Sequence, residues 1–372
     1  MNALAEYGLF VVKLLTVLAL VLGAVGAALG AAARARRRGA LPDAGAEGRV
    51  RVRRFNEQLE KLSEALAVSA LEPADRREAA RERRARDKRE AKAAAKARKA
   101  AAKAAKRRRG GGETRVPEPA RPRTFVLDFQ GDVRASAVEG LRREITAVLT
   151  SATSEDEVVV RLDSGGGLVA PYGLGASQLD RVRKARVRLV VAVDRVAASG
   201  GYMMGAVGDR LVAAPFAILG SIGVVAQVPN FHRLLERYDI DFETLTAGKY
   251  KRTLTLFGEN TEEGRAKFLE DITRIHEQFK SHVARHRPSL DIERVSTGEI
   301  WSGEDALELG LADELLTSDE YLVRAAESRE VLLVDWKRKR GLGERLSLGA
   351  TAAIERLAVS IVDALQRSRY GG

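Results

Sequence analysis

The sequence of 372 residues contains no cysteine. This absence excludes disulfides, thiolate metal sites and a cysteine nucleophile. Histidine is scarce too, with His232, His276, His282 and His286 as the four examples. His282 and His286 are four residues apart and could share a metal ion, but no acidic third ligand stands at the spacing of a zinc motif. We therefore expect these histidines at the surface and predict no metal site.

The net positive charge comes from one part of the chain. The formal net charge is +12, and residues 76–109 hold 17 Lys and Arg against four Asp and Glu, so the rest of the chain is close to neutral. This segment consists of strong helix formers without a large apolar stripe, which predicts a solvated helix. A nucleic-acid partner is therefore disfavoured. A plain spacer, or a contact with anionic lipid worth about 1 kcal/mol per basic residue, fits better.

The sequence begins with an apolar segment. Residues 14–33 carry no charge, and about 20 such residues in a helix span a bilayer core. We predict a membrane anchor in preference to a cleaved signal peptide or a buried helix, because signal peptides have a shorter apolar core behind a basic start. The arginines at 34–38 favour a cytoplasmic domain.

Composition divides the chain into four parts. Residues 1–33 form the predicted anchor, and residues 34–123 a linker with a short amphipathic helix within 52–71, the basic helix, and a Gly/Pro spacer. Residues 124–335 have the composition of a folded domain. Residues 336–372 show helical apolar spacing and could pack on a neighbouring subunit or a membrane surface.

The domain shows alternating strand and helix patterns, which predict an α/β fold with parallel pairing. Strands are expected at 124–129, 157–163, 187–193 and 210–213, and helices at 135–150, 168–184, after residue 199, at 262–287 and at 301–309. The continuous apolar run within 157–163 is typical of a sheet that is buried on both faces.

Three glycine-rich turns follow strand-like segments, at 164–167, 199–202 and 220–223. Ligands of open α/β sheets bind beyond the carboxyl ends of the strands, where glycine exposes backbone N–H groups. Neither the GxxxxGK[ST] motif nor a GxGxxG after the first strand is present, so a phosphate site is weakly supported. An oxyanion hole beside a nucleophilic serine is the sharper hypothesis.

Ser199 is the candidate nucleophile, because small neighbours leave its hydroxyl accessible at a strand-to-helix turn. The competing interpretation is that Ser199 only caps the following helix. No histidine adjoins a glycine-rich turn, so a lysine base is the other option, and it must be held neutral. Lys249 and Lys251 are the candidates.

Three ordered motifs carry a resemblance to a known family. They are AASGGYMM at 197–204, APFAILGSIGV at 214–224 and GKYKRTLT at 248–255. Together they resemble the signal peptide peptidase A family of serine–lysine proteases, and the similarity extends over essentially the whole chain.

The resemblance implies a ClpP/crotonase-like fold and peptide-bond hydrolysis through an acyl-enzyme. Ser199 would be the nucleophile, Lys251 the general base and Ser221 the residue that orients the lysine. The oxyanion would be held by the Ser199 N–H together with Gly166 or Gly167. The family usually has proline where this chain has Gly165, which loosens the turn without removing a donor, since proline has no N–H.

The same resemblance implies a single-pass protein of the bacterial inner membrane, with a homo-oligomeric assembly and a polypeptide substrate such as signal-peptide remnants. No cofactor is needed. Relatives place the catalytic domain outside the cytoplasm, against the arginine flank, so both topologies stay open. Two other functions compete: a non-proteolytic membrane scaffold that binds lipid or nucleic acid through residues 76–109, and a crotonase-type acyl-CoA enzyme.

Overall fold

A computed structural model describes residues 48–70 and 121–338, together with single positions between 72 and 96. The predicted anchor at 14–33, most of the basic segment and nearly all of the predicted C-terminal helix lie outside the described residues. Among the described residues, no helix is both long and apolar enough to cross a membrane.

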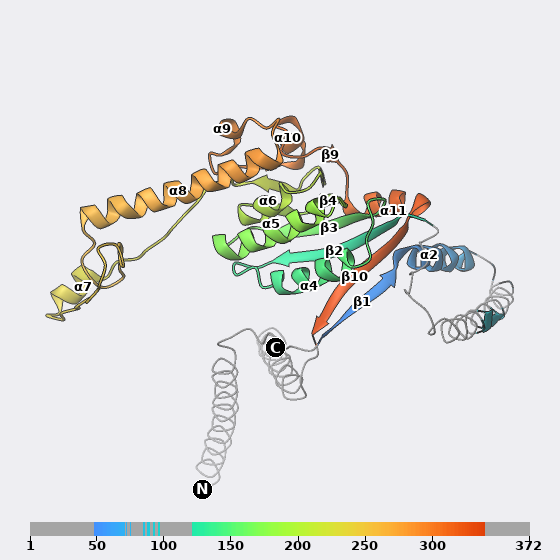
Figure 1. The fold of residues 1–372 in the computed structure, drawn as a ribbon, viewed down its shortest axis with the longest axis horizontal. Helices are drawn as coiled ribbons and strands as arrows, with labels where there is room; N and C mark the ends of the chain where they lie inside the picture. The colour runs from blue at the N-terminus through green and yellow to red at the C-terminus, as the bar shows by residue number, and fades with distance from the viewer. Residues whose placement is uncertain are drawn as a thin grey trace, which may run out of the picture. The chain divides into compact units, whose positions relative to one another are not determined.

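A mostly parallel sheet forms the centre of the unit that contains residues 50–336 (Figure 1). The main strand order is β1-β10-β2-β3-β4-β6-β9. The bounds are β1 Gly48–Arg54, β10 Glu330–Arg338, β2 Arg123–Gly131, β3 Glu157–Ser164, β4 Arg188–Val193, β6 Arg210–Ala213 and β9 Glu314–Leu315. The predicted α/β class with parallel pairing is confirmed.

A short layer branches from the carboxyl end of β3. Here β5 (Val196–Ala198) pairs in parallel with β3 and with β7 (Ile218–Gly220), and β7 pairs antiparallel with β8 (Ile300–Ser302). The helix α6 (Gly200–Gly205) follows β5 directly. The turns 199–202 and 220–223 follow β5 and β7 in this layer. The third glycine-rich turn, 164–167, follows β3, with which β5 pairs.

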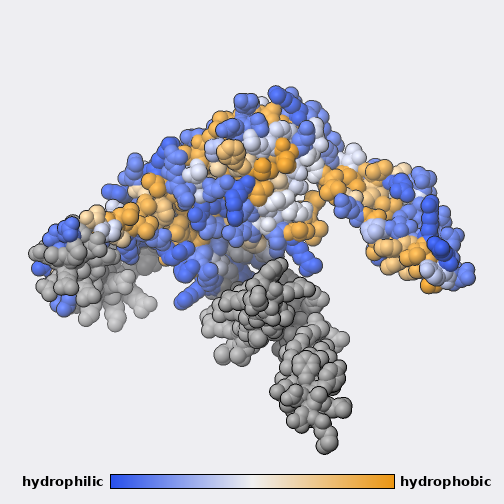
Figure 2. All heavy atoms as spheres, turned by 180° about the vertical axis from the view of Figure 1, so that it is seen from behind, coloured by the Kyte–Doolittle hydropathy of each residue, from blue (hydrophilic) through white to orange (hydrophobic). Residues whose placement is uncertain are grey.

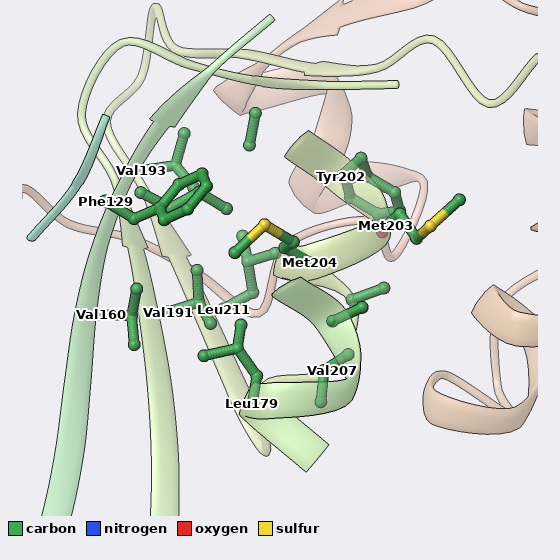
Figure 3. Packing of buried hydrophobic residues seen from close by; sticks show 14 of the residues in the cluster. Phe129, Val160, Leu179, Val191, Val193, Tyr202, Met203, Met204, Val207 and Leu211 are labelled. Carbon is green, nitrogen blue, oxygen red and sulfur yellow. The ribbon is translucent and has the colours of Figure 1, made fainter. Parts of the chain in front are cut away.

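The helices α4 (Val138–Leu149), α5 (Val169–Lys184) and α6 cover one face of the sheet, and their apolar sides pack on it. Figure 3 shows Phe129, Val160 and Val191 from the strands facing Leu179 of α5 and Met204 of α6. On the opposite face, a smaller cluster joins Val126, Val159, Val190 and Val212 to Leu322 of α11 (Ser318–Ser328). The strand β3 is therefore buried on both sides, as its apolar run predicted.

The long helix α8 (Glu262–His286) follows an irregular segment, residues 224–261, that contains only the short helix α7 (His232–Arg237). Figure 1 shows this segment at the N-terminal end of α8, whereas α6 lies against its C-terminal half. The short elements α9 (Ile292–Val295) and α10 (Gly303–Glu308) follow.

The predicted linker contributes to the fold. The expected amphipathic helix is present as α2 (Phe55–Ser69), but the residues before it form the edge strand β1 beside β10. Asn56 fixes the junction: its amide donates to the carbonyls of Ala326 and Arg329 and accepts from the Val331 N–H. The strands β5, β9 and β10 and the helices α7, α9 and α11 were not predicted, and β7 was expected only as a strand-like segment before the turn at 220–223. The strand β8 occupies the start of the helix expected at 301–309.

Candidate active site

Ser199 stands between β5 and α6 with φ of +51° and ψ of −121°. A non-glycine residue in this region is strained, and such strain gathers at functional sites. Ser199 is half-buried, and its side chain makes no capping hydrogen bond to α6. The helix-cap interpretation therefore lacks its hydrogen bond.

Glycines let α6 approach the end of β3. A Cβ on Gly201 would lie 2.4 Å from the carbonyl oxygen of Ser164, and a Cβ on Gly200 would lie 2.5 Å from the ring of Tyr172. Real Cβ atoms do not come that close to other atoms. Glycine is therefore needed at positions 200 and 201 so that α6 can begin directly after Ser199 and pack against Ser164 and Tyr172.

The glycine-rich turn after β3 lies against Ser199. The two segments meet because β3 and β5 pair with Ser164 opposite Ala197. Gly166 has φ of +88°, and a Cβ there would lie 2.7 Å from both the Gly200 nitrogen and the Ser199 Cβ. Only glycine permits this contact.

The backbone N–H groups of this corner have different partners. The Ser199 N–H, expected to be an oxyanion donor, donates to the Gly220 carbonyl at 2.8 Å. The Gly166 N–H donates to the Ser164 Oγ at 3.1 Å. In the described part of the chain, no acceptor is found for the Gly167 or Gly200 N–H. Among the described residues, the N–H groups of Gly201 and Tyr202 in the first turn of α6 have no acceptor either. Gly167 and Gly200 are therefore two candidate oxyanion donors, and the sequence did not single out Gly200.

Ser221 lies beside Ser199, because Ala198 pairs with Gly220 in the preceding register step. It is half-buried with φ of +51°, and its N–H donates to the Glu299 carbonyl at 2.6 Å. The β5–β7 pairing thus brings both predicted serines to one edge.

Neither candidate lysine is near that edge. Lys251 is exposed in segment 224–261, and no contact with Ser199 or Ser221 is found among the described residues. The nearby Thr253 carbonyl lies against Gly264, in the first turn of α8. By contrast, the Ile222 carbonyl, next to Ser221, accepts from His276. His276 lies 12 residues after Gly264 on α8, which is about 18 Å along the helix.

Lys249 is unsuited to act as a base. Its amine lies 2.7 Å from the Glu263 carboxylate and 5.1 Å from the centre of the Tyr250 ring. Hydrogen bonding to Glu263 raises the pKa of Lys249, which favours the charged form. A general base must lose its proton, so this environment acts in the wrong direction.

Three of the histidines join α8 to the domain. The nitrogen Nε2 of His282 lies 2.9 Å from the Met203 carbonyl, and Nδ1 of His286 lies 2.7 Å from the Arg183 guanidinium. These two rings are half-buried, as are those of His232 and His276. Among the described residues, no cluster of three or more His, Asp or Glu could hold a metal ion.

Comparisons with known proteins place the chain in a family. The model of the N-terminal part of peptidase family S49 matches residues 2–179, and the model of peptidase family S49 matches residues 181–332. The probable protease SohB of Haemophilus influenzae is 42% identical over 361 residues, covering 97% of this chain and 96% of that protein. The chain belongs to peptidase family S49.

A second S49 relative supports the assignment. The probable protease SohB of Buchnera aphidicola from Acyrthosiphon pisum is 53% identical over 227 residues, which cover 61% of this chain and 68% of the relative. The family expected from the three motifs is thereby confirmed, and the chain is a protease of S49 type. The alternatives of a non-proteolytic scaffold and an acyl-CoA enzyme are not favoured.

Proposed function

We propose that this S49 protease is a serine endopeptidase that hydrolyses peptide bonds through an acyl-enzyme on Ser199. The observation that carries this proposal is the strained Ser199 at the β5–α6 turn, with the N–H groups of Gly167 and Gly200 free beside it. Such donors stabilise the negative oxygen that develops when a serine attacks a carbonyl. No metal or organic cofactor takes part in this chemistry.

We further propose that Lys251 acts as the general base from a neighbouring copy of the chain. The motif resemblance assigns the base to Lys251, yet segment 224–261 holds it at the far end of α8 from α6. The site of one chain is therefore incomplete. Ser221, at the same edge as Ser199, would receive and orient the incoming amine.

Exposed apolar side chains on segment 224–261 support such an assembly. They include Val225, Leu234, Tyr238, Ile240 and Leu245, with Leu245 at 92% exposure. Figure 2 shows orange patches along the corresponding arm at the right of the view. Exposed apolar groups in this number mark a protein contact, here with the homo-oligomer partner.

Co-expression of two inactive variants tests the shared site. Ser199→Ala and Lys251→Ala should each abolish cleavage of a peptide or casein by the full-length protein. Mixed oligomers would regain about a quarter of wild-type activity, because random head-to-tail assembly pairs an intact serine with an intact lysine at that frequency. Activity in either single variant contradicts the dyad. Inactive mixed oligomers contradict the sharing between copies.

The membrane location and the substrate are part of the same proposal. The apolar residues 14–33 would anchor the protein in the bacterial inner membrane, with residues 76–109 as a spacer that contacts anionic lipid. Signal-peptide remnants and other membrane-associated polypeptides would then be the accessible substrates. Carbonate extraction of membranes tests the anchor, and protease protection in spheroplasts reports which side holds the domain. Liposome and RNA binding of a variant that lacks residues 76–109 tests the role of this segment. Unchanged binding to both indicates a spacer, and a loss of binding indicates a ligand site.

A further inference from the structure

Tyr172, in the first turn of α5, is fully buried beneath the Ser199 corner, with 0% of its surface exposed. Its hydroxyl lies 2.5 Å from the Ser164 Oγ and donates to the Asp132 carbonyl at 2.8 Å. Neither serine–lysine chemistry nor the family motifs quoted above use this residue. A buried phenol next to the reacting corner therefore needs its own explanation.

The hydrogen bonds run in one direction. Tyr172 has a single hydroxyl proton, and when it is donated to the Asp132 carbonyl the Ser164 hydroxyl is the donor to the Tyr172 oxygen. The other acceptor for the Ser164 hydroxyl is the Gly131 carbonyl, at the longer distance of 3.5 Å. The remaining lone pair of the Ser164 Oγ accepts the Gly166 N–H at 3.1 Å. The chain therefore runs from the Gly166 amide through Ser164 and Tyr172 to the Asp132 carbonyl.

This chain fixes the turn that carries the free Gly167 N–H. Ser164 holds the Gly166 N–H, whereas the N–H of the exposed Gly167 has no acceptor among the described residues. The turn is also held by the Leu168 N–H, which donates to the Val133 carbonyl at 2.8 Å, whereas Gly165 is exposed. The Ser164–Tyr172 hydrogen bonds add to this restraint on the turn.

Tyr172 also contacts the second free donor. The ring carbon Cγ would lie 2.5 Å from a Cβ on Gly200, so the ring packs directly under that residue. The phenol oxygen would likewise lie 2.4 Å from a Cβ on Gly131, at the end of β2. One side chain thus touches the backbone on both sides of the reacting corner.

We propose that Tyr172, acting with Ser164, is a positioning residue that aligns the Gly167 and Gly200 N–H groups into one oxyanion hole. This role rests on the proposed serine peptidase function. Preorganised donors are effective because they need no rearrangement as the negative charge develops. Burial raises the pKa of Tyr172, so the phenol stays protonated and keeps donating at neutral pH.

Full-length Tyr172→Phe and Ser164→Ala, singly and together, test the role. Direct loss of an oxyanion donor lowers kcat by about 10²–10³-fold, so a loss of alignment should lower kcat by roughly tenfold. The KM for a peptide substrate should change by less than about twofold, since substrate binding is untouched. The inhibition constant of a matching peptide aldehyde, whose Ser199 adduct places its oxygen in the same hole, should rise by the same factor as kcat falls.

The double variant and a matched control make the test specific. Because the Tyr172 and Ser164 hydroxyls belong to one hydrogen-bond chain that ends at the Gly166 N–H, Tyr172→Phe combined with Ser164→Ala should be no worse than the poorer single variant. Tyr321→Phe is the control, since it also removes a partly buried phenol hydroxyl, bonded to Glu157 at 3.2 Å on the opposite face of the sheet. It should change thermal stability but neither kcat nor the aldehyde constant.

The outcomes separate the two proposals. If Ser199→Ala is inactive while Tyr172→Phe and Ser164→Ala keep wild-type kcat and aldehyde affinity, the positioning role is wrong and the peptidase mechanism stands. Multiplicative losses in the double variant also overturn it. If Ser199→Ala retains activity, the proposed mechanism fails and the oxyanion role fails with it. Should Tyr172→Phe not fold, Ser164→Ala alone decides by the same readouts.

Discussion

Ser199 and Ser221 follow paired strands in register and share the same unusual backbone conformation, with φ of +51° at each. The Ser199 N–H donates to the carbonyl of Gly220, the residue before Ser221, at 2.8 Å. The β5–β7 pairing therefore ends in two strained turns side by side. The strain at Ser199 is held by packing, because glycine at positions 200 and 201 lets α6 start immediately after it.

Replacing Ser199 by glycine should stabilise the protein while removing activity. Glycine tolerates positive φ, so Ser199→Gly should raise the free energy of unfolding by about 1 kcal/mol, the strain relieved less the extra chain entropy. Ser199→Ala keeps the strain and is the matched control, expected near wild-type stability. Chemical denaturation of both variants gives the comparison. Equal stability of the two variants would show that Ser199 stores no strain.

Two adjacent glycines should respond oppositely to alanine. A Cβ on Gly165 meets nothing within 4 Å, so Gly165→Ala should raise the free energy of unfolding by about 0.4–1 kcal/mol through the unfolded chain. Gly166→Ala places a Cβ 2.7 Å from the Gly200 nitrogen at a φ of +88°, and should lower both stability and kcat. Thermal unfolding and peptide hydrolysis measure the pair. A stabilised, active Gly166→Ala would contradict the contact described here.

Acid should weaken the attachment of α8 through His286. Burial, followed by the nearby His282 and Arg183, lowers the pKa of His286 from 6.5 to about 4. Between pH 6.5 and about 4 the unfolded chain therefore binds a proton that the folded protein does not, so stability falls as pH falls and is unaffected above 6.5. The ring is half-buried, so the loss is about 1–2 kcal/mol rather than the full value of the shift.

His286→Gln is the variant that isolates this titration. Glutamine retains an oxygen that can accept from Arg183 but does not titrate. The pH dependence of unfolding should therefore become shallower between pH 6.5 and 4, with stability at pH 8 little changed. An unchanged slope would assign the acid sensitivity to other groups, with His282 first, because burial lowers its pKa as well.

Local patterns predicted most of the central elements. The strands β2, β3, β4 and β6 and the helices α4, α5 and α8 lie within a few residues of their expected positions, because each is a long apolar or amphipathic run. The strands β5 and β9 were missed, since two or three residues carry no periodic signal. The edge strand β1 was assigned to a linker because its residues are mainly Arg and Val and mostly exposed.

The site was predicted in part. Glycine-rich turns and motif resemblance pointed to Ser199, Ser221 and the 164–167 turn, and strand pairing brings all three together. No local pattern favours the Gly200 N–H over the Ser199 N–H, because the Gly220 carbonyl that accepts from Ser199 is 21 residues away in the sequence. Tyr172 was overlooked too. An aromatic residue in the first turn of a helix after a glycine-rich turn is the signal that could have found it.

The sequence by itself determined the class of fold, the S49 motifs, the absence of thiol chemistry and the confinement of the charge to residues 76–109. These properties depend on local composition and spacing. Only the tertiary structure decided which N–H groups have partners, that the buried Tyr172 hydroxyl contacts Ser164, and that segment 224–261, which contains Lys251, lies at the N-terminal end of α8. Hydrogen-bond partners and the distance between Lys251 and Ser199 depend on contacts between segments that are distant in sequence, so no local pattern encodes them.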